Sequence, residues 1–217
     1  MATTPRGERT RARILHVAAD AFAERGYADT SLEDLVAAAK VTKGAFYFHF
    51  ESKESLAHAV VEAGHCQMET CRADIESTEP DPIRRIVRMV FATAALYRTD
   101  AIARGTTRLL EESNQLRTPL RRLSVSWVEW LTTTLEEAAG HGQLAPGSNP
   151  VDLAEMINAS VYGVQQLSYT RTGWTDLQAR TCTLLYHLLP SFVATPQLGD
   201  DLRVFVLSDP GGDFGEA

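Results

Sequence analysis

The chain has 217 residues, of which 44% are hydrophobic and 23% are charged. This composition predicts a packed globular protein and excludes an intrinsically disordered chain. The formal net charge is −7, which excludes a surface that is basic throughout. The charge is uneven, because residues 1–53 carry eight Lys or Arg and seven Asp or Glu, leaving −8 for the remainder. Only the N-terminal part is therefore expected to meet an anionic partner.

Several classes of protein are not expected from this sequence. No run of 18 or more apolar residues is present, and no apolar segment follows the basic N-terminus, so neither a membrane-spanning helix nor a secretory signal is expected. Cys66, Cys71 and Cys182 lack metal-binding spacing and are interpreted as reduced thiols of a cytoplasmic protein. No nucleophile–base pair, phosphate-binding loop or metal-ligand set is visible, so no catalytic residue, metal or cofactor is predicted.

A basic, amphipathic helix is predicted over residues 9–25. Ile14 and Phe22 recur at helical spacing on its buried face, and Gly26 favours a left-handed residue at its end. Four arginines lie within residues 6–13. They are interpreted either as a solvated charged face or as an arm that contacts phosphates.

Two short helices separated by a tight turn are predicted next. Ser31 begins the first, which runs to residue 39, and Thr42 is a good N-cap for the second, because its hydroxyl can accept a hydrogen bond from an unpaired backbone N–H. Helical spacing predicts a buried face with Val41, Ala45 and Phe48, and an exposed face with Lys43, Gly44 and Tyr47. A cation, a bare backbone and a phenol on one face suit a DNA groove, so this pair is interpreted as a helix-turn-helix.

A characteristic pattern covers roughly residues 9–62. It reads Arg-Ile-Leu-x-x-Ala-x-x-x-Phe-x-x-x-Gly-Tyr, then Thr-Ser, then Val-Thr-Lys-Gly-Ala-Phe-Tyr-Phe-His-Phe-x-Ser-Lys-Glu. This pattern resembles the TetR family of one-component repressors, and most closely its γ-butyrolactone receptor branch in antibiotic-producing actinobacteria. The resemblance implies an all-α fold. A three-helix, helix-turn-helix DNA-binding domain would occupy residues 1–53, a helical ligand-binding and dimerisation domain residues 54–195, and a C-terminal tail residues 196–217.

The resemblance also implies which residues contact DNA. Carried over by position, these are Thr30, Thr42, Lys43, Gly44, Tyr47, His49 and Lys53. Two residues depart from the family pattern: Phe46 replaces a usual leucine, and Lys40 stands where the family usually has glycine in the turn. If the backbone at Lys40 is left-handed, lysine costs roughly 1 kcal/mol relative to glycine.

The rest of the chain is predicted to be helical, with no strand-like alternation. Helices are expected over residues 52–77, 82–98, 100–110, 119–140, 151–169 and 176–193. Two prolines within residues 79–82 separate the helix over 52–77 from the helix over 82–98, because proline cannot continue a helix interior. Residues 141–150 are the most loop-like stretch of the body.

Candidate ligand contacts lie on two of these helices. Trp127 and Trp130 are one turn apart, and although a helical tryptophan alone usually belongs to the core, the resemblance implies a tryptophan that covers the ligand, best matched by Trp127. Tyr162, Gln165 and Gln166 lie in an otherwise apolar helix. A buried amide without a partner costs about 1–3 kcal/mol, so a ligand oxygen could be that partner, but exposure explains each glutamine equally well.

These features together predict a ligand-responsive repressor. Surplus apolar and small residues on the last two helices favour pairing with a second copy, and a homodimer could read palindromic double-stranded operator DNA. A small amphiphilic signal of γ-butyrolactone, butenolide or furan type would release it. One alternative is a drug-responsive TetR-type repressor of an efflux gene, and another, a small helical enzyme or carrier, lacks any reactive constellation.

Overall fold

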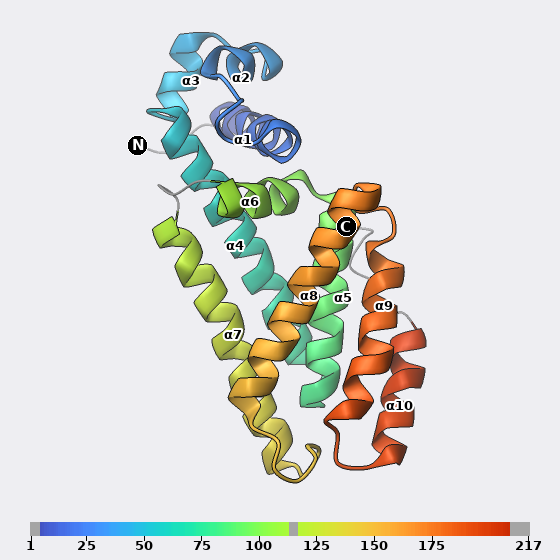
Figure 1. Cartoon of the computed structure of the whole chain (residues 1–217). Coiled ribbons are helices and arrows are strands. Elements are labelled where there is room, and N and C mark those ends of the chain that lie inside the picture. Colours follow the sequence, from blue (N-terminus) through green and yellow to red (C-terminus); the bar gives the residue numbers. More distant parts are fainter. Residues whose placement is uncertain (1–4, 113–116, 209–217) are drawn as a thin grey trace. The chain divides into compact units, whose positions relative to one another are not determined.

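The computed structural model describes residues 5–112 and 117–208, and the regular elements of these ranges are helices (Figure 1). The short helices are α2 (Leu32–Ala38), α3 (Lys43–His49), α6 (Ala101–Glu112), α9 (Leu177–Leu188), the 3-10 turn η1 (Leu189–Ser191) and α10 (Pro196–Leu207). The long helices are α1 (Pro5–Arg25), α4 (Lys53–Thr78), α5 (Pro82–Thr99), α7 (Arg117–Gly140) and α8 (Pro150–Thr172). The expectation of an all-α protein is confirmed.

The chain forms two compact units. Unit 1 comprises Met1–Gln67 and Asp100–Leu123, and unit 2 comprises Met68–Thr99 and Ser124–Ala217. Helix α4 therefore contributes to both units, and α6 packs with the N-terminal helices. The functional division at residue 53 that the sequence suggested stays a prediction, because compactness does not report which residues bind DNA or ligand.

Unit 1 encloses an apolar core between its N-terminal helices and α6. Helix α1 begins at Pro5, four residues earlier than expected, since proline is tolerated in the first turn of a helix. It ends before Gly26, whose φ of +83° confirms the predicted left-handed residue. The side chains that fill this core are almost fully buried, and they include Ile14, Phe22, Leu35, Phe46, Leu56 and Leu109.

Glycines let α6 approach its neighbours closely in unit 1. A Cβ added to Gly105 would lie 2.6 Å from the carbonyl oxygen of Ala19 in α1, and a Cβ on Gly64 in α4 would overlap the side chain of Thr106. The Thr106 hydroxyl donates a hydrogen bond to the Val60 carbonyl at 3.2 Å. These contacts make α6 part of the support of the N-terminal helices.

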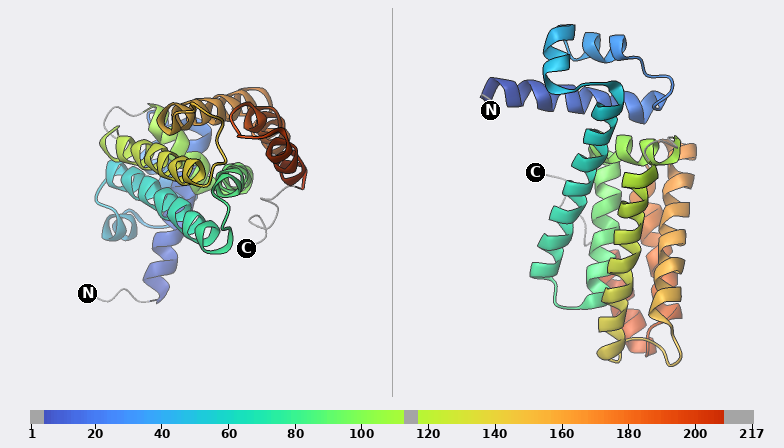
Figure 2. Two further views of the ribbon diagram at one scale, coloured as in Figure 1. Left: turned by 90° about the horizontal axis from the view of Figure 1, so that it is seen from below. Right: turned by 90° about the vertical axis from the view of Figure 1, so that its left-hand side faces the viewer.

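In unit 2, helix α9 packs against both α8 and α5 (Figure 2). Helix α4 ends at Thr78, and α5 begins at Pro82, as the two prolines predicted. Arg85 joins α5 to α7 through two hydrogen bonds to the Glu137 carboxylate, at 2.7 and 2.9 Å. Its Nε also donates to the Glu79 carbonyl at 2.8 Å, so Arg85 ties the proline-containing turn to the bundle.

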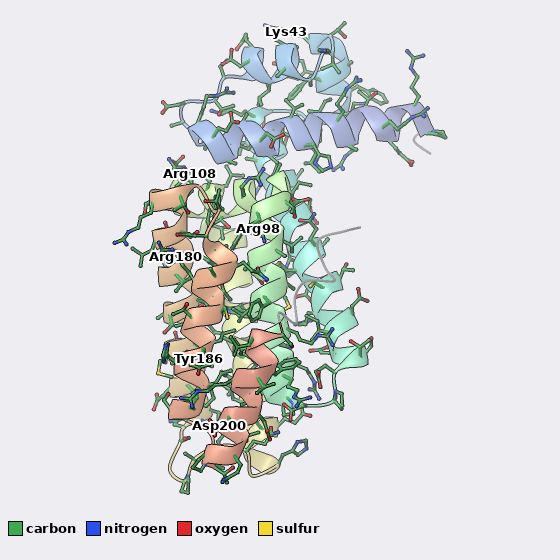
Figure 3. All side chains as sticks on the ribbon, turned by 90° about the vertical axis from the view of Figure 1, so that its right-hand side faces the viewer. Lys43, Arg98, Arg108, Arg180, Tyr186 and Asp200 are labelled. Carbon is green, nitrogen blue, oxygen red and sulfur yellow. The ribbon has the colours of Figure 1, made fainter. Side chains whose placement is uncertain are left out.

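The expected C-terminal tail needs correction for residues 196–207, which form α10. Thr195 caps this helix by accepting the Leu198 N–H at 3.2 Å, and the buried residues Leu202 and Val206 are one turn apart. The Arg203 guanidinium lies 5.1 Å from the Tyr186 ring of α9 and donates to Asp200 at 3.0 Å (Figure 3). Residues 209–217 of the expected tail lie outside the described residues.

Candidate nucleic-acid interface

Helix α3 is a seven-residue helix fixed at its beginning by a side-chain cap. The Thr42 hydroxyl accepts the Ala45 N–H at 3.1 Å, with Thr42 itself in an extended conformation. At the other end, the Phe50 N–H donates to the Phe46 carbonyl at 2.9 Å. The predicted N-cap is therefore confirmed, and the local sequence alone accounts for where this helix begins.

The exposed face of α3 carries the three residues that the helical spacing predicted. Tyr47 is 52% exposed, and Lys43 and Gly44 are also exposed. A Cβ added to Gly44 would meet only the Thr42 hydroxyl, at 4.0 Å, so internal packing does not require glycine here. Its absent side chain instead leaves bare backbone open to a partner that approaches closely.

The predicted buried face of α3 is wrong at Phe48. Phe48 is 76% exposed, whereas Phe46 and Phe50 are buried. The spacing was counted from Val41, which precedes the cap and lies outside the helix. Phe46 and Phe48 are separated by about 200° around a helix axis, so only one of them can face the core. Phe48 is the exposed apolar residue of this face that sequence reasoning missed, and its separation from Phe46 was the available signal.

The turn before α3 holds a lysine in a left-handed conformation. Lys40 has φ +52°. Its N–H donates to the Ala37 carbonyl at 3.0 Å, and the Val41 N–H donates to the Val36 carbonyl at 3.3 Å. This pair of bonds is the Schellman arrangement, in which glycine usually takes the left-handed position. The conditional expectation of a left-handed turn at Lys40 is confirmed.

Lys43 is paired within the protein. Its Nζ lies 3.0 Å from Oε1 of Glu33 in α2, and the two side chains are 62% and 67% exposed (Figure 3). The hydrogen bond between them, with their mutual attraction, lowers the pKa of Glu33 and raises the pKa of Lys43. Lys43 is therefore charged and accessible, with a carboxylate that an anionic partner would have to displace.

Two of the predicted DNA contacts, Thr30 and Lys53, have internal partners. Thr30 is 1% exposed, and its hydroxyl donates to the Gly26 carbonyl at 2.7 Å. The Lys53 ammonium donates to the carbonyls of Tyr27 and Thr30 at 2.8 and 2.9 Å and lies 4.1 Å from the Tyr27 ring centroid. The enclosed Thr30 hydroxyl is not accessible to a partner in the free protein, and a DNA contact by Lys53 stays a prediction. Both residues support the connection between α1 and α2.

His49, the remaining predicted contact, lies half-buried at the end of α3, where it lines a groove together with Thr42. The structure thus brings Thr42, Lys43, Gly44, Tyr47 and His49 together on one short helix and its cap. Residues 5–112 and 117–208 contain no group of three His, Cys, Asp or Glu that could hold a metal ion. Within the same ranges, no helix is both long and apolar enough to cross a membrane.

Comparison with known proteins agrees with this arrangement. Residues 14–60 match the model of the bacterial regulatory proteins of the tetR family. The HTH-type transcriptional repressor DhaR of Mycobacterium sp. (strain GP1) is 30% identical over 168 residues, which cover 75% of this chain and 82% of DhaR. The chain belongs to the TetR family. This TetR-family protein is therefore a DNA-binding transcriptional regulator.

Two further relatives of this TetR-family chain cover more of its length. The A-factor receptor protein of Streptomyces griseus is 32% identical over 194 residues, which cover 88% of this chain but 66% of the receptor, just under two thirds of its length. The TetR family protein CprB from S. coelicolor A3(2) superimposes with a TM-score of 0.84 at 28% identity, covering 95% of this chain and 99% of CprB. Another structure shows CprB in complex with its biological operator sequence, with a TM-score of 0.81 at 28% identity over 94% of this chain and 97% of CprB.

The predicted ligand contacts of this TetR-family regulator fall in different environments. Trp130 is buried, its ring stacks on that of Trp127 with centroids 5.2 Å apart, and its indole N–H donates to Glu76 at 2.6 Å. Both tryptophans adjoin the core of unit 2. On α8, Tyr162 is 51% exposed, and Gln165 and Gln166 are half-buried. Their roles in ligand binding stay predictions.

Proposed function

We propose that this TetR-family regulator is a repressor that binds palindromic operator DNA as a homodimer and is released by a small amphiphilic signal. The observation that carries the proposal is the exposed face of α3, where Lys43, Gly44 and Tyr47 are accessible beside Phe48. A lysine can reach a base edge or a phosphate, a tyrosine hydroxyl can donate to a phosphate oxygen, and phenylalanine can contact a thymine methyl group. Such a protein acts by binding rather than catalysis, at DNA in the cytoplasm.

The α8 surface supports a homodimer. Met156 and Leu167 are 37% and 45% exposed, and a Cβ built on Gly163 between them meets nothing within 4 Å. Their spacing of seven and four residues places all three on one helical face. A second copy could cover this apolar face with its own, in the two-fold arrangement typical of homodimers. Two α3 helices about 34–36 Å apart could then enter successive major grooves.

The proposed signal is a γ-butyrolactone, a butenolide or a related furan. Support comes from the A-factor receptor relative and from the structure of a γ-butyrolactone receptor (ArpA-like protein), which superimposes with a TM-score of 0.81 at 28% identity over 95% of this chain and 98% of that receptor. The stacked Trp127 and Trp130 add to it, because Trp130 belongs to the core of unit 2 and Trp127 packs against that core. An apolar cavity with few polar groups is typical of sites for such molecules. Signal and operator would favour different states of the dimer, so each weakens binding of the other by the same factor.

Selection from a random duplex library tests DNA binding and identifies the preferred sequence in the same experiment. The wild-type chain should enrich an inverted repeat with half-sites about one helical turn apart. Lys43→Ala should bind that repeat more weakly, with a shallower dependence on salt. Arg25→Ala is the control, because Arg25 is also exposed but lies at the far end of α1. Equal binding by Lys43→Ala and the wild type would contradict the proposed contact.

A release assay tests the signal. γ-Butyrolactones, butenolides, furans and unrelated drugs would be added to the preformed operator complex, and fluorescence anisotropy would report dissociation. The proposal expects release by a lactone or furan, with Trp127→Phe shifting the concentration required. Release by the drugs alone would instead favour the alternative repressor of an efflux gene.

A further inference from the structure

A basic groove of about 460 Å³ lies between the first turns of α1 and the segment from Lys40 to α3, all within unit 1. Its polar and aromatic lining includes Arg6, Arg13, Lys40, Thr42, Phe48 and His49. Three of these side chains carry a permanent positive charge and come from two segments far apart in the sequence. None of the residues that line the groove is acidic.

The three cations of the groove differ from eight other Lys or Arg side chains of the described residues, which are paired with a carboxylate. Arg85, Arg180 and Arg203 each form an ion pair with a carboxylate. Arg6, Arg13 and Lys40 have no ion-pair partner among residues 5–112 and 117–208, although the chain carries more acidic than basic residues. Three cations left unpaired around one hollow create a site of positive potential.

Lys40 occupies this groove at a conformational cost. Its φ of +52° lies in the left-handed region, which disfavours any residue with a Cβ and which glycine adopts freely. Packing does not explain the lysine, because its side chain is exposed. A residue held in an unfavourable backbone conformation at a surface hollow indicates a functional role for its side chain.

We propose that this groove binds the phosphate backbone of DNA beside the major groove that α3 enters. Lys40, Arg6 and Arg13 supply the charge, and the Thr42 hydroxyl, whose oxygen accepts the Ala45 N–H, can still donate its own proton to a phosphate oxygen. Duplex DNA is the occupant because the groove is continuous with the exposed face of α3 that is proposed to enter the major groove. Thr42 lines the groove and caps α3, and Phe48 belongs both to the groove and to that exposed face. The inference rests on the proposed DNA binding and adds contacts that are independent of base sequence.

Phosphate contacts have a signature that separates them from base contacts. Each phosphate neutralised by a cation contributes about 0.9 to the slope of log affinity against log salt. A homodimer carries two copies of Lys40, so removing this charge should flatten the slope by about 2 and weaken binding about 10- to 100-fold at low salt. The loss should be equal for the selected operator and for unrelated duplex, leaving the ratio of the two affinities unchanged.

Four substitutions in the full-length chain test the site. Lys40→Gly and Lys40→Asn both remove the charge and both tolerate a left-handed backbone, Lys40→Arg retains the charge, and Arg25→Gln removes an exposed charge outside the groove. Affinity for the selected operator and for unrelated duplex would be measured by anisotropy between about 50 and 200 mM salt. The melting temperature of each variant would also be measured, and we expect that of Lys40→Gly to equal or exceed the wild-type value.

The expected result is parallel loss of both affinities in Lys40→Gly and Lys40→Asn, with Lys40→Arg and Arg25→Gln close to wild type. Wild-type affinity and salt slope in the two neutral variants would overturn the phosphate site while leaving the proposed function intact. A loss confined to the selected operator would also overturn it, because Lys40 would then contact bases. A wild-type chain that binds no duplex would overturn the proposed function and this site together.

Discussion

Nζ of Lys43 in α3 lies 3.0 Å from Oε1 of Glu33 in α2, which joins the two helices of the helix-turn-helix by an exposed ion pair. The lysine proposed to enter a DNA groove is therefore held against a carboxylate in the free protein. DNA has to replace that carboxylate with a phosphate oxygen or a base edge. Because both side chains are largely in solvent, breaking this ion pair costs little free energy.

Glu33→Gln should raise operator affinity. The substitution frees Lys43 and removes a negative charge beside the proposed interface, so we expect a gain of up to about fivefold at low salt that fades as salt screens the charges. Anisotropy titrations over a salt series would measure it. Glu24→Gln is the matched control, because Glu24 is exposed at the end of α1 and outside the interface. A loss of affinity would show instead that Glu33 holds Lys43 in the conformation that binds.

The two phenylalanines of α3 should respond oppositely to truncation. Phe46 is 0% exposed and Phe48 is 76% exposed. Phe46→Ala should lower the free energy of unfolding by about 3–5 kcal/mol, because it leaves a cavity in the core. Phe48→Ala should change stability by less than about 0.5 kcal/mol while weakening operator binding. Urea unfolding and anisotropy together test the pair, and similar unfolding midpoints for the two variants would refute the assignment of the faces.

Because α6 approaches α1 closely, replacing a glycine by alanine should change the free energy of unfolding very differently at Gly105 and at Gly140. A Cβ on Gly105 would lie 2.6 Å from the backbone oxygen of Ala19, whereas a Cβ on Gly140 would meet nothing within 4 Å. Gly105→Ala should therefore destabilise by about 1–3 kcal/mol through overpacking. Gly140→Ala should be neutral or stabilise by up to about 1 kcal/mol, because alanine loses less backbone entropy in a helix. Urea unfolding would measure both, and a stabilised Gly105→Ala variant would contradict the packing described.

Acid should weaken the turn between α8 and α9. Asp176 accepts hydrogen bonds from the hydroxyls of Ser168 and Thr172 at 2.7 and 2.8 Å and from Nε of Arg180 at 2.7 Å. The Arg180 bond, followed by the two hydroxyls, holds the pKa of Asp176 well below its ordinary value. A lowered pKa contributes stability that is present above the unfolded value of about 3.9 and is lost as pH falls through the folded value.

Asp176→Asn should accordingly melt at a lower temperature than the wild type at neutral pH. Its melting temperature should also fall less steeply below about pH 4, because the titrating carboxylate is gone. Thermal melting across the acid range would measure this difference, with Asp201→Asn as the control at an exposed position. Parallel curves for Asp176→Asn and the wild type would show that this carboxylate does not stabilise the turn.

Local sequence was sufficient to predict where α2 and α3 begin and where α1 ends. Ser31 and Thr42 cap their helices through hydroxyl oxygens that accept an N–H three residues on, at 3.1 Å in both cases, and Gly26 and Lys40 take left-handed conformations after the helices they follow. These features depend only on bonds between residues a few positions apart. The exposed positions of Lys43, Gly44 and Tyr47 also agree with the helical spacing of this local segment.

Only the tertiary structure decided which side chains have internal partners. Phe46 rather than Phe48 faces the core, Thr30 is enclosed, and Lys53 donates to carbonyls more than 20 residues away. Burial and long-range hydrogen bonds depend on where other elements lie, and the sequence of a single helix does not specify its neighbours. The basic groove has the same origin, because Arg6, Arg13 and Lys40 meet there through the packing of separate segments rather than through their spacing in the chain.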